Sequence, residues 1–277
     1  MIILENGKEV SWPEQNTIIG DVQGDENTII EFKGTGSILF CEDGVRLESS
    51  HIRFCTVNAV VYLSSGRWPY KINIDAWRDT TAYFGRDNYY NGTLTAILSE
   101  KKSVIIGGGG VFSFGIWIRT ADPHLLYDAS TKKRINPSKS VLIGDHVWLG
   151  QNATILKGTR IGSGSVLAAG AVISGKAAGS NTVWGGNPAR EIRKNIIFTG
   201  ASVHDYTEKR TKDSQLLEGE EYLFSGGGDL LSIDELDKLF FRKTPVERVV
   251  ILKGLAAKPD RNRFYIAPGK TGLLRRR

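Results

Sequence analysis

The chain has few cysteines and lacks long apolar runs. Cys41 and Cys55 are the only two cysteines among its 277 residues. Two thiols in so long a chain form no disulfide framework, so we expect both to be reduced. The absence of any run of about eighteen apolar residues argues against a membrane-spanning helix. The opening MIILENGKEVSWPEQ lacks the basic region and apolar core of a secretory signal, and we therefore expect a cytoplasmic protein.

Glycine, in contrast, is abundant. The chain holds 32 glycines without a collagen-like triplet, while its hydrophobic content of 40% and charged content of 24% are ordinary for a globular protein. Glycine is used where the backbone must turn tightly, so this composition favours a fold with many corners. The length allows one large domain or two ordinary ones.

An aliphatic residue recurs every six positions in the middle of the chain. The series is Ile143, Leu149, Ile155, Ile161, Leu167 and Ile173. A six-residue period fits neither the 3.6-residue turn of an α-helix nor the alternation of a strand. It fits a chain that turns a corner every six residues, with three short strands in each coil. Stacked coils bury the aliphatic side chains in one column, so the pattern predicts an all-β solenoid.

The same period occurs upstream at Ile106, Phe112 and Ile118, and then pauses until Ile143. The intervening segment, about 119–142, is polar and contains two prolines, so we expect it to protrude as a loop. Residues 16–118 carry a weaker pattern, which we interpret as earlier and less regular coils. The solenoid domain is thus predicted to span 1–199.

Residues 200–277 change character and are predicted to form a partly helical C-terminal extension. Two segments carry helix signals. In SIDELDKLFF, Ser232 and Glu235 form a capping-box pattern. In TPVERVVILKGL, Thr244 is the expected N-cap, Pro245 the first helical residue and Gly254 the stop.

Basic residues gather at the end of the chain, in PGKTGLLRRR, and contribute to a formal net charge of +6. A solvated tail is one interpretation, because chain ends are often poorly ordered. The alternative is attraction to a polyanion or to an anionic membrane surface. The sequence leaves both open.

Three stretches in this order carry a resemblance to a known family. They are DPHLLYD (122–128), RINPSKSVLIGDHVWLGQNATILKGTRIGSGSVLAAGAVI (134–173) and GGNPAREIRKNI (185–196). They resemble the hexapeptide-repeat acetyltransferases, most of all the branch that O-acetylates bacterial capsular and surface polysaccharides, including polysialic acid, and more distantly the maltose and galactoside acetyltransferases. The resemblance covers residues 103–198 well. It implies a left-handed parallel β-helix and a homotrimer that binds acetyl-CoA between adjacent subunits.

The resemblance assigns catalysis to His124 and Trp148. His124, on the expected loop, matches the family's catalytic base. A sugar hydroxyl is a poor nucleophile, and an imidazole can accept its proton near neutral pH. Trp148 precedes a repeat aliphatic and should point outward, where its family counterpart lines the acceptor and thioester pocket. His146, which replaces an Asn of other members, is the rival base.

The resemblance also assigns acetyl-CoA contacts. The matching residues are Gln151, Ala169, Ser174, Arg190 and Arg193. The first three would offer backbone or small polar contacts, and the two arginines carry the charge to meet the nucleotide's phosphates. Neither cysteine falls on the loop or beside Trp148, so direct transfer is favoured over an acetyl-cysteine intermediate. No cluster of His, Cys, Asp and Glu suggests a metal site.

These observations predict an acetyl-CoA-dependent O-acetyltransferase that acts on a polysaccharide or its sugar precursor, and no nucleic-acid partner. The acceptor can be anionic, and the basic tail can hold the enzyme near a membrane site of capsule assembly. Two alternatives stay open. One is an N-acetyltransferase for a nucleotide-linked amino sugar, and the other is a non-catalytic structural or binding solenoid.

Overall fold

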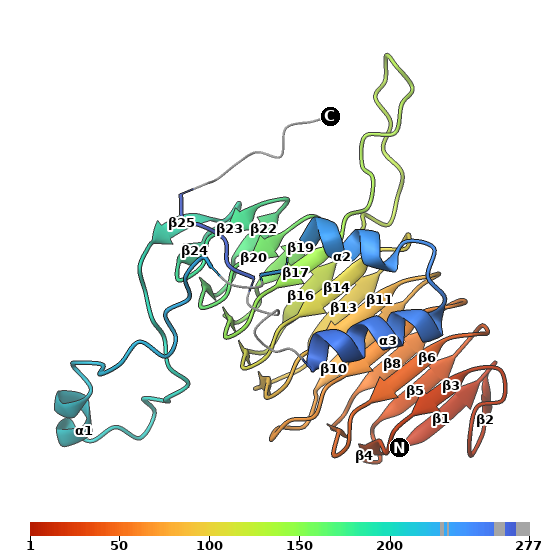
Figure 1. Ribbon diagram of the computed structural model, residues 1–277, viewed down its shortest axis with the longest axis horizontal. Helices are drawn as coiled ribbons and strands as arrows, with labels where there is room; N and C mark the ends of the chain where they lie inside the picture. Colours follow the sequence, from red (N-terminus) through yellow and green to blue (C-terminus); the bar gives the residue numbers. More distant parts are fainter. Residues whose placement is uncertain (228–229, 232, 258–263, 270–277) are drawn as a thin grey trace.

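Mainly parallel β-strands form the three faces of one solenoid in the computed structural model, which describes residues 1–227, 230–231, 233–257 and 264–269 (Figure 1). The first face has the order β2(Lys8–Glu9), β1(Ile2–Glu5), β5(Ile29–Phe32), β8(His51–Phe54), β10(Ile72–Ala76), β13(Leu94–Leu98), β16(Ile116–Arg119), β19(Thr154–Leu156), β22(Val172–Ser174). The second face has the order β3(Thr17–Ile19), β6(Ile38–Cys41), β9(Val60–Leu63), β11(Thr81–Phe84), β14(Ser103–Ile106), β17(Val141–Ile143), β20(Arg160–Ile161), β23(Ala177–Ala178). The third face holds the pair β4(Gln23–Gly24) and β7(Arg46–Leu47), then β12(Tyr89–Tyr90), β15(Val111–Phe112), β18(Trp148–Leu149), β21(Val166–Leu167), β24(Val183–Gly185), β25(Arg190–Arg193).

Each coil visits the first, second and third faces in turn. We name the corner between the first and second faces the first corner, and the corner between the third and first faces the third corner. The first corner lies opposite the third face across the coil. This arrangement confirms the predicted all-β solenoid of parallel coils.

The strand register shows two coil lengths. Thr154 pairs with Val172, eighteen residues on, which is three hexapeptides. Earlier, His51 pairs with Asn73, twenty-two residues on. The four extra residues per coil explain why the six-residue pattern weakens upstream of residue 100. Trp117 pairs with Thr154, thirty-seven residues on, because the loop predicted around 119–142 leaves the solenoid between them.

The repeat aliphatics fill one continuous core. Ile106, Ile143 and Ile161 are in register on the second face and at most 2% exposed. Truncating one such side chain to Ala typically costs about 2–5 kcal/mol. The coils also stack closely at their corners, since a Cβ on Gly150 would lie 2.5 Å from the backbone nitrogen of Ala169.

The C-terminal extension packs against the second face. Helices α2(Ile233–Phe240) and α3(Pro245–Ala256) cover it (Figure 1). This contact buries the outward side chains of the strands against the helices: Ile38, Phe40, Val60, Tyr62, Tyr83, Ile105, Leu142, Leu236, Val249, Leu252, Leu255. The second face is therefore apolar on both sides, which explains the continuously buried runs in β6, β9, β11 and β14.

Helix α3 begins as the sequence predicts but ends later. The Thr244 side chain accepts a hydrogen bond from the backbone of Glu247, which closes a capping box, and Pro245 occupies the first turn. The predicted stop at Gly254 is wrong, because the helix continues to Ala256. Leu255 is 6% exposed, so packing against the second face holds the last turn. Ser232 of the other predicted capping box lies outside the described residues.

A buried guanidinium fastens α3 to the coils. Arg248 is 2% exposed and donates hydrogen bonds to the backbone oxygens of Asn58, Asp79 and Thr80 and to the hydroxyl of Thr81. Burial lowers the pKa of Arg248 to about 10, still far above neutral pH. The positive charge thus satisfies carbonyls that a helix of apolar side chains would leave without partners.

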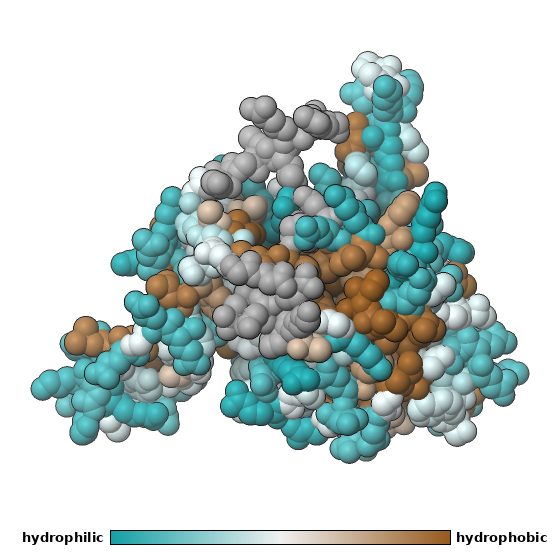
Figure 2. Space-filling model, viewed as in Figure 1, coloured by the Kyte–Doolittle hydropathy of each residue, from teal (hydrophilic) through white to brown (hydrophobic). Residues whose placement is uncertain are grey.

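The extension leaves apolar surface on its outer side. Phe241, Val246 and Val250 are exposed, and Figure 2 shows hydrophobic atoms gathered over α3. Helix α1(Glu208–Asp213) lies on an arm that projects from the solenoid and buries none of its residues (Figure 1). Within the described part of the chain, no helix has the length and apolarity needed to cross a bilayer. Most of the basic tail, 270–277, lies outside the described residues.

Candidate active site

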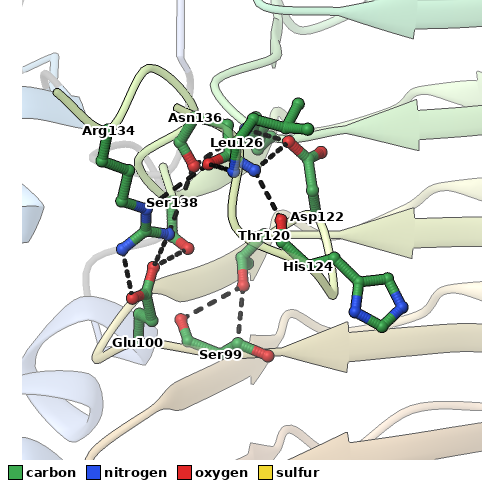
Figure 3. Close-up of polar contacts among 10 residues, drawn as sticks. Ser99, Glu100, Thr120, Asp122, His124, Leu126, Arg134, Asn136 and Ser138 are labelled. Atoms are coloured by element: carbon green, nitrogen blue, oxygen red, sulfur yellow. Dashed lines mark hydrogen bonds and ion pairs between the residues drawn. The ribbon is translucent and has the colours of Figure 1, made fainter. Parts of the chain in front are cut away.

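The loop between β16 and β17 stands away from the solenoid and is braced by one amide (Figures 1 and 3). Asn136 is 5% exposed. Its Nδ2 donates to the backbone oxygen of His124 at 2.8 Å and to Oδ2 of Asp122 at 3.0 Å, and its Oδ1 accepts from the backbone of Leu126 at 2.8 Å. One side chain therefore ties the segment that returns to the solenoid to the segment that carries His124.

Ion pairs anchor the foot of the loop. Arg134 donates to both oxygens of Glu100 at 2.7 and 2.8 Å, and the Ser138 hydroxyl also donates to Glu100. These hydrogen bonds lower the pKa of Glu100 to about 2, so it remains ionised at neutral pH. On the other side, Lys157 contacts Asp122 at 2.6 Å. The loop is thus a positioned element of the first corner.

His124 lies on this braced loop with its side chain free to meet a substrate. The residue is exposed, and Figure 3 shows the imidazole pointing away from the hydrogen-bonded network. Its backbone is held by Asn136 while the ring stays outside the brace. The structure therefore presents the predicted base on a fixed backbone.

Trp148 lies on β18 of the third face and is 42% exposed, so its side chain points outward as the repeat predicts. The ring of Phe198 lies 6.0 Å from it at an angle of 45°. Phe198 follows the last strand of the solenoid. The C-terminal segment thus forms one wall beside the indole.

His146 is held in an aromatic stack. Its ring lies parallel to Phe198 and Tyr222, with centroids 4.0 Å apart in both pairs. Its Nε2 lies 2.8 Å from the Phe198 carbonyl oxygen, which accepts the hydrogen bond. Burial lowers the pKa of His146, and the ring is 8% exposed. Both ring faces are covered, so His146 is poorly placed to reach a substrate.

Two of the predicted acetyl-CoA contacts lie next to each other on the third corner. Gln151 and Ala169 are exposed in successive coils, and the backbone oxygen of Gln151 accepts a hydrogen bond from Gly170 at 2.7 Å. The corner thus presents a small side chain and an amide at the surface of adjacent coils.

The predicted arginines extend the same side of the molecule. Arg190 and Arg193 lie on β25, which pairs antiparallel with β24 at the end of the third face, and both are exposed. No carboxylate among the described residues forms an ion pair with either arginine. They are therefore available to phosphate groups.

Within one copy of the chain, the predicted site residues form two groups that are separated in space. Ser174 ends β22 at the first corner, on the coil above Lys157, and shares that corner with the His124 loop. Trp148, Gln151, Ala169, Arg190 and Arg193 lie on the third face or the third corner. No contact joins His124 to Trp148 among the described residues.

The thiols give no alternative nucleophile. Cys41 is buried and Cys55 is partly buried, and burial raises their pKa values to about 12 and about 11. Both therefore stay protonated near neutral pH. In the described ranges, no group of His, Cys, Asp and Glu side chains is arranged to hold a metal ion.

Three supporting residues escaped the sequence reasoning. They are Asn136, Phe198 and Asn181. The amide of Asn181 is 4% exposed and contacts the backbone of Ile196, Tyr222 and Phe224, so it closes the base of the projecting arm. Asn136 precedes Pro137, which marked the loop but not its brace. Phe198 and Asn181 carry no local signal, because their partners are distant in sequence.

Comparison with known proteins confirms the resemblance to hexapeptide-repeat acetyltransferases. Residues 140–175 match the family described as bacterial transferase hexapeptide (six repeats). The chain is 46% identical over 68 residues to the polysialic acid O-acetyltransferase of Neisseria meningitidis, a match over 24% of this chain and 31% of the relative. It is 39% identical over 102 residues to the polysialic acid O-acetyltransferase of Escherichia coli O1:K1, over 37% and 33% of the two chains. The matches thus span about a third of these curated relatives.

The similarity extends further in three dimensions. The crystal structure of the polySia-specific acetyltransferase NeuO aligns with a TM-score of 0.62 at 27% identity and covers 72% of this chain and 93% of that chain. The shared fold therefore reaches well beyond the hexapeptide segment.

Proposed function

We propose that this chain is an acetyl-CoA-dependent O-acetyltransferase that modifies a sugar hydroxyl of a bacterial capsular or surface polysaccharide, or of its precursor. The observation that carries the proposal is the exposed imidazole of His124, held by Asn136 on a loop that protrudes from a hexapeptide solenoid. The activity for which the two polysialic acid relatives are named supports the substrate class.

The proposed chemistry needs one base and no covalent enzyme intermediate. A ring nitrogen of His124 accepts the proton of the sugar hydroxyl as the oxygen attacks the thioester carbonyl. The carbon–sulfur bond breaks, and the same proton passes to the departing thiolate of coenzyme A. A positioned base of this kind typically contributes about 10²–10⁴ in rate. Trp148 would form a wall of the pocket in which this transfer occurs.

We further propose that the working site forms between copies of the chain in a homotrimer. The His124 loop and Ser174 lie at the first corner, whereas Trp148, Gln151 and the arginines lie on the opposite side. If the first corner of one copy faces the third face of the next, the two groups meet in one groove. Acetyl-CoA would then lie along the third corner, with its phosphates near Arg190 and Arg193.

The test is acetyl transfer by purified protein to a panel of capsular polysaccharides, with free thiol release as the readout. His124→Ala should lower kcat at least about a hundredfold and leave the oligomer intact. His146→Asn is the matched control and should retain activity. Activity that survives His124→Ala and is lost in His146→Asn would move the base to His146. Transfer only to an amino sugar would favour the N-acetyltransferase alternative.

A further inference from the structure

A cavity of about 600 Å³ lies at the first corner, on the coils that precede the His124 loop. Its lining comes from three successive coils and consists of Thr56, Trp77, Arg78, Ser99, Glu100 and Lys101. The catalytic chemistry proposed above uses none of these residues. The cavity therefore needs an explanation of its own.

Trp77 offers an apolar platform on a rigid corner. Its side chain is 44% exposed. Its backbone is fixed, because its oxygen accepts a hydrogen bond from the Thr80 hydroxyl at 2.7 Å and its nitrogen donates to Leu98 at 3.2 Å. A large indole held in this way can stack on the C–H face of a sugar ring at little entropic cost.

The charged groups around Trp77 favour an anion. Arg78 is exposed and forms no ion pair with any residue that the structure describes. The Lys101 side chain is 71% exposed, and its Nζ lies 3.6 Å from Oδ2 of Asp79, which is a long ion-pair distance. Glu100 is already bound by Arg134. Asp79 and Glu100 thus each have a basic partner already. The planar guanidinium of Arg78 can bind a further carboxylate through two hydrogen bonds.

The cavity is continuous with the catalytic loop. Ser99 donates its backbone N–H to the hydroxyl of Thr120 at 2.8 Å, and Glu100 holds Arg134 of the same loop. Figure 3 shows Ser99 and Glu100 directly at the foot of the loop that carries His124. A sugar unit in the cavity would therefore place its neighbours in the polymer near the base.

From these contacts we infer that the Trp77–Arg78–Lys101 cavity is a polymer subsite that binds a carboxylated sugar unit of the acceptor, beyond the unit that is acetylated. The inference rests on the proposed function for its choice of ligand. The ring of the sugar stacks on Trp77, and its carboxylate pairs with Arg78 and Lys101. The subsite gives the enzyme a preference for long anionic acceptors over short or neutral ones.

Calorimetric titration of the full-length protein with polysialic acid tests the subsite without requiring turnover. Trp77→Ala and Arg78→Ala should each raise Kd about fivefold or more, as expected for the loss of one stacking or charge-assisted contact. Wild-type binding should weaken with salt. Trp68→Ala, which removes an equally exposed Trp outside the cavity, and Lys8→Ala, which removes a distant charge, should bind as the wild type does.

The outcomes separate the subsite from the function. Equal Kd values for wild type and both cavity variants, or no binding by the wild type, would overturn the subsite even if acetyl transfer occurs. Binding that is lost in the variants, without any transfer by the wild type, would retain the subsite and reject the proposed function. A changed molecular mass of Trp77→Ala in light scattering would instead make the cavity a contact between copies. Equally tight binding of oligothymidylate through the same residues would make it a nucleic-acid surface. Either result would overturn the inference.

Discussion

The imidazole of His146 lies on the ring of Phe198, with centroids 4.0 Å apart and planes within 7° of each other. The same imidazole hydrogen-bonds the Phe198 carbonyl oxygen at 2.8 Å. This one residue therefore holds the start of the C-terminal segment beside Trp148. His146 sits at a φ of 50°, a left-handed conformation that His and Asn tolerate better than most residues.

His146 should make stability depend on pH. Burial lowers its pKa below the ordinary value of 6.5, so the unfolded chain binds this proton more readily than the folded chain. The free energy of unfolding should consequently fall as the pH drops below about 6.5, until the folded-state pKa is passed. Urea denaturation at pH 7.5 and 5.5 measures this change.

The control is His146→Asn, since Asn suits the left-handed backbone and does not titrate. This variant should show a smaller loss of stability over the same pH range. An identical loss in both proteins would assign the effect to other groups.

Asn136→Ala should reduce turnover through the position of the loop. The substitution removes the hydrogen bonds that tie Asp122, the backbone of His124 and Leu126 together. We expect kcat to fall about tenfold or more while KM for acetyl-CoA changes little, because a displaced base affects the transition state. Steady-state kinetics at saturating acetyl-CoA provide the measurement.

The control for Asn136 is Asn136→Asp, which keeps the contact with the Leu126 N–H and loses the donors. Because its second carboxylate oxygen would face the oxygens of His124 and Asp122, this variant should lose at least as much kcat as Asn136→Ala if the brace to His124 matters. Unchanged kcat in Asn136→Ala would show that the loop holds its geometry without this amide.

Trp148→Ala should cut activity strongly with little change in Tm. The side chain is 42% exposed and contributes little to the core, and we propose that it forms a wall of the reaction pocket. Activity per folded oligomer and thermal melting distinguish the two roles. A drop in Tm with full activity per oligomer would make Trp148 a packing residue.

Replacing Arg190 or Arg193 by Ala should raise KM for acetyl-CoA with a small effect on kcat. Each change would remove the proposed charge-assisted contact to phosphate, which is expected to be made equally in the ground and transition states. Calorimetric affinity for coenzyme A is the direct measurement, and desphospho-coenzyme A is a suitable comparison ligand. Variants that bind as tightly as the wild type would remove these arginines from the site.

The solenoid and its loop could be predicted because their signals are local. The series from Ile143 to Ile173 repeats in sequence what the coils repeat in space, since each coil contacts only its neighbours. The interruption after Ile118 marked the loop for the same reason. The upstream coils were less clear, because twenty-two residues per coil shift the aliphatic side chains out of the six-residue register. The predicted helix end at Gly254 was wrong, because the packing of Leu255 on the second face outweighs the tendency of glycine to end a helix.

From the sequence we could predict, through its resemblance to a known family, which residues would carry the proposed chemistry: a histidine on a polar loop, an outward Trp and a pair of arginines after the last coil. How these residues are supported depends on the tertiary structure. Asn136 contacts His124, twelve residues earlier, and Phe198 packs on His146, fifty-two residues earlier. Arg248 binds the backbone oxygens of Thr80 and Asn58, which lie 168 and 190 residues upstream. Such contacts join side chains through folded geometry and leave no periodic trace in the chain. The separation of the predicted site residues between the first corner and the third face is also a property of the coil, because three faces separate residues that follow one another closely in sequence.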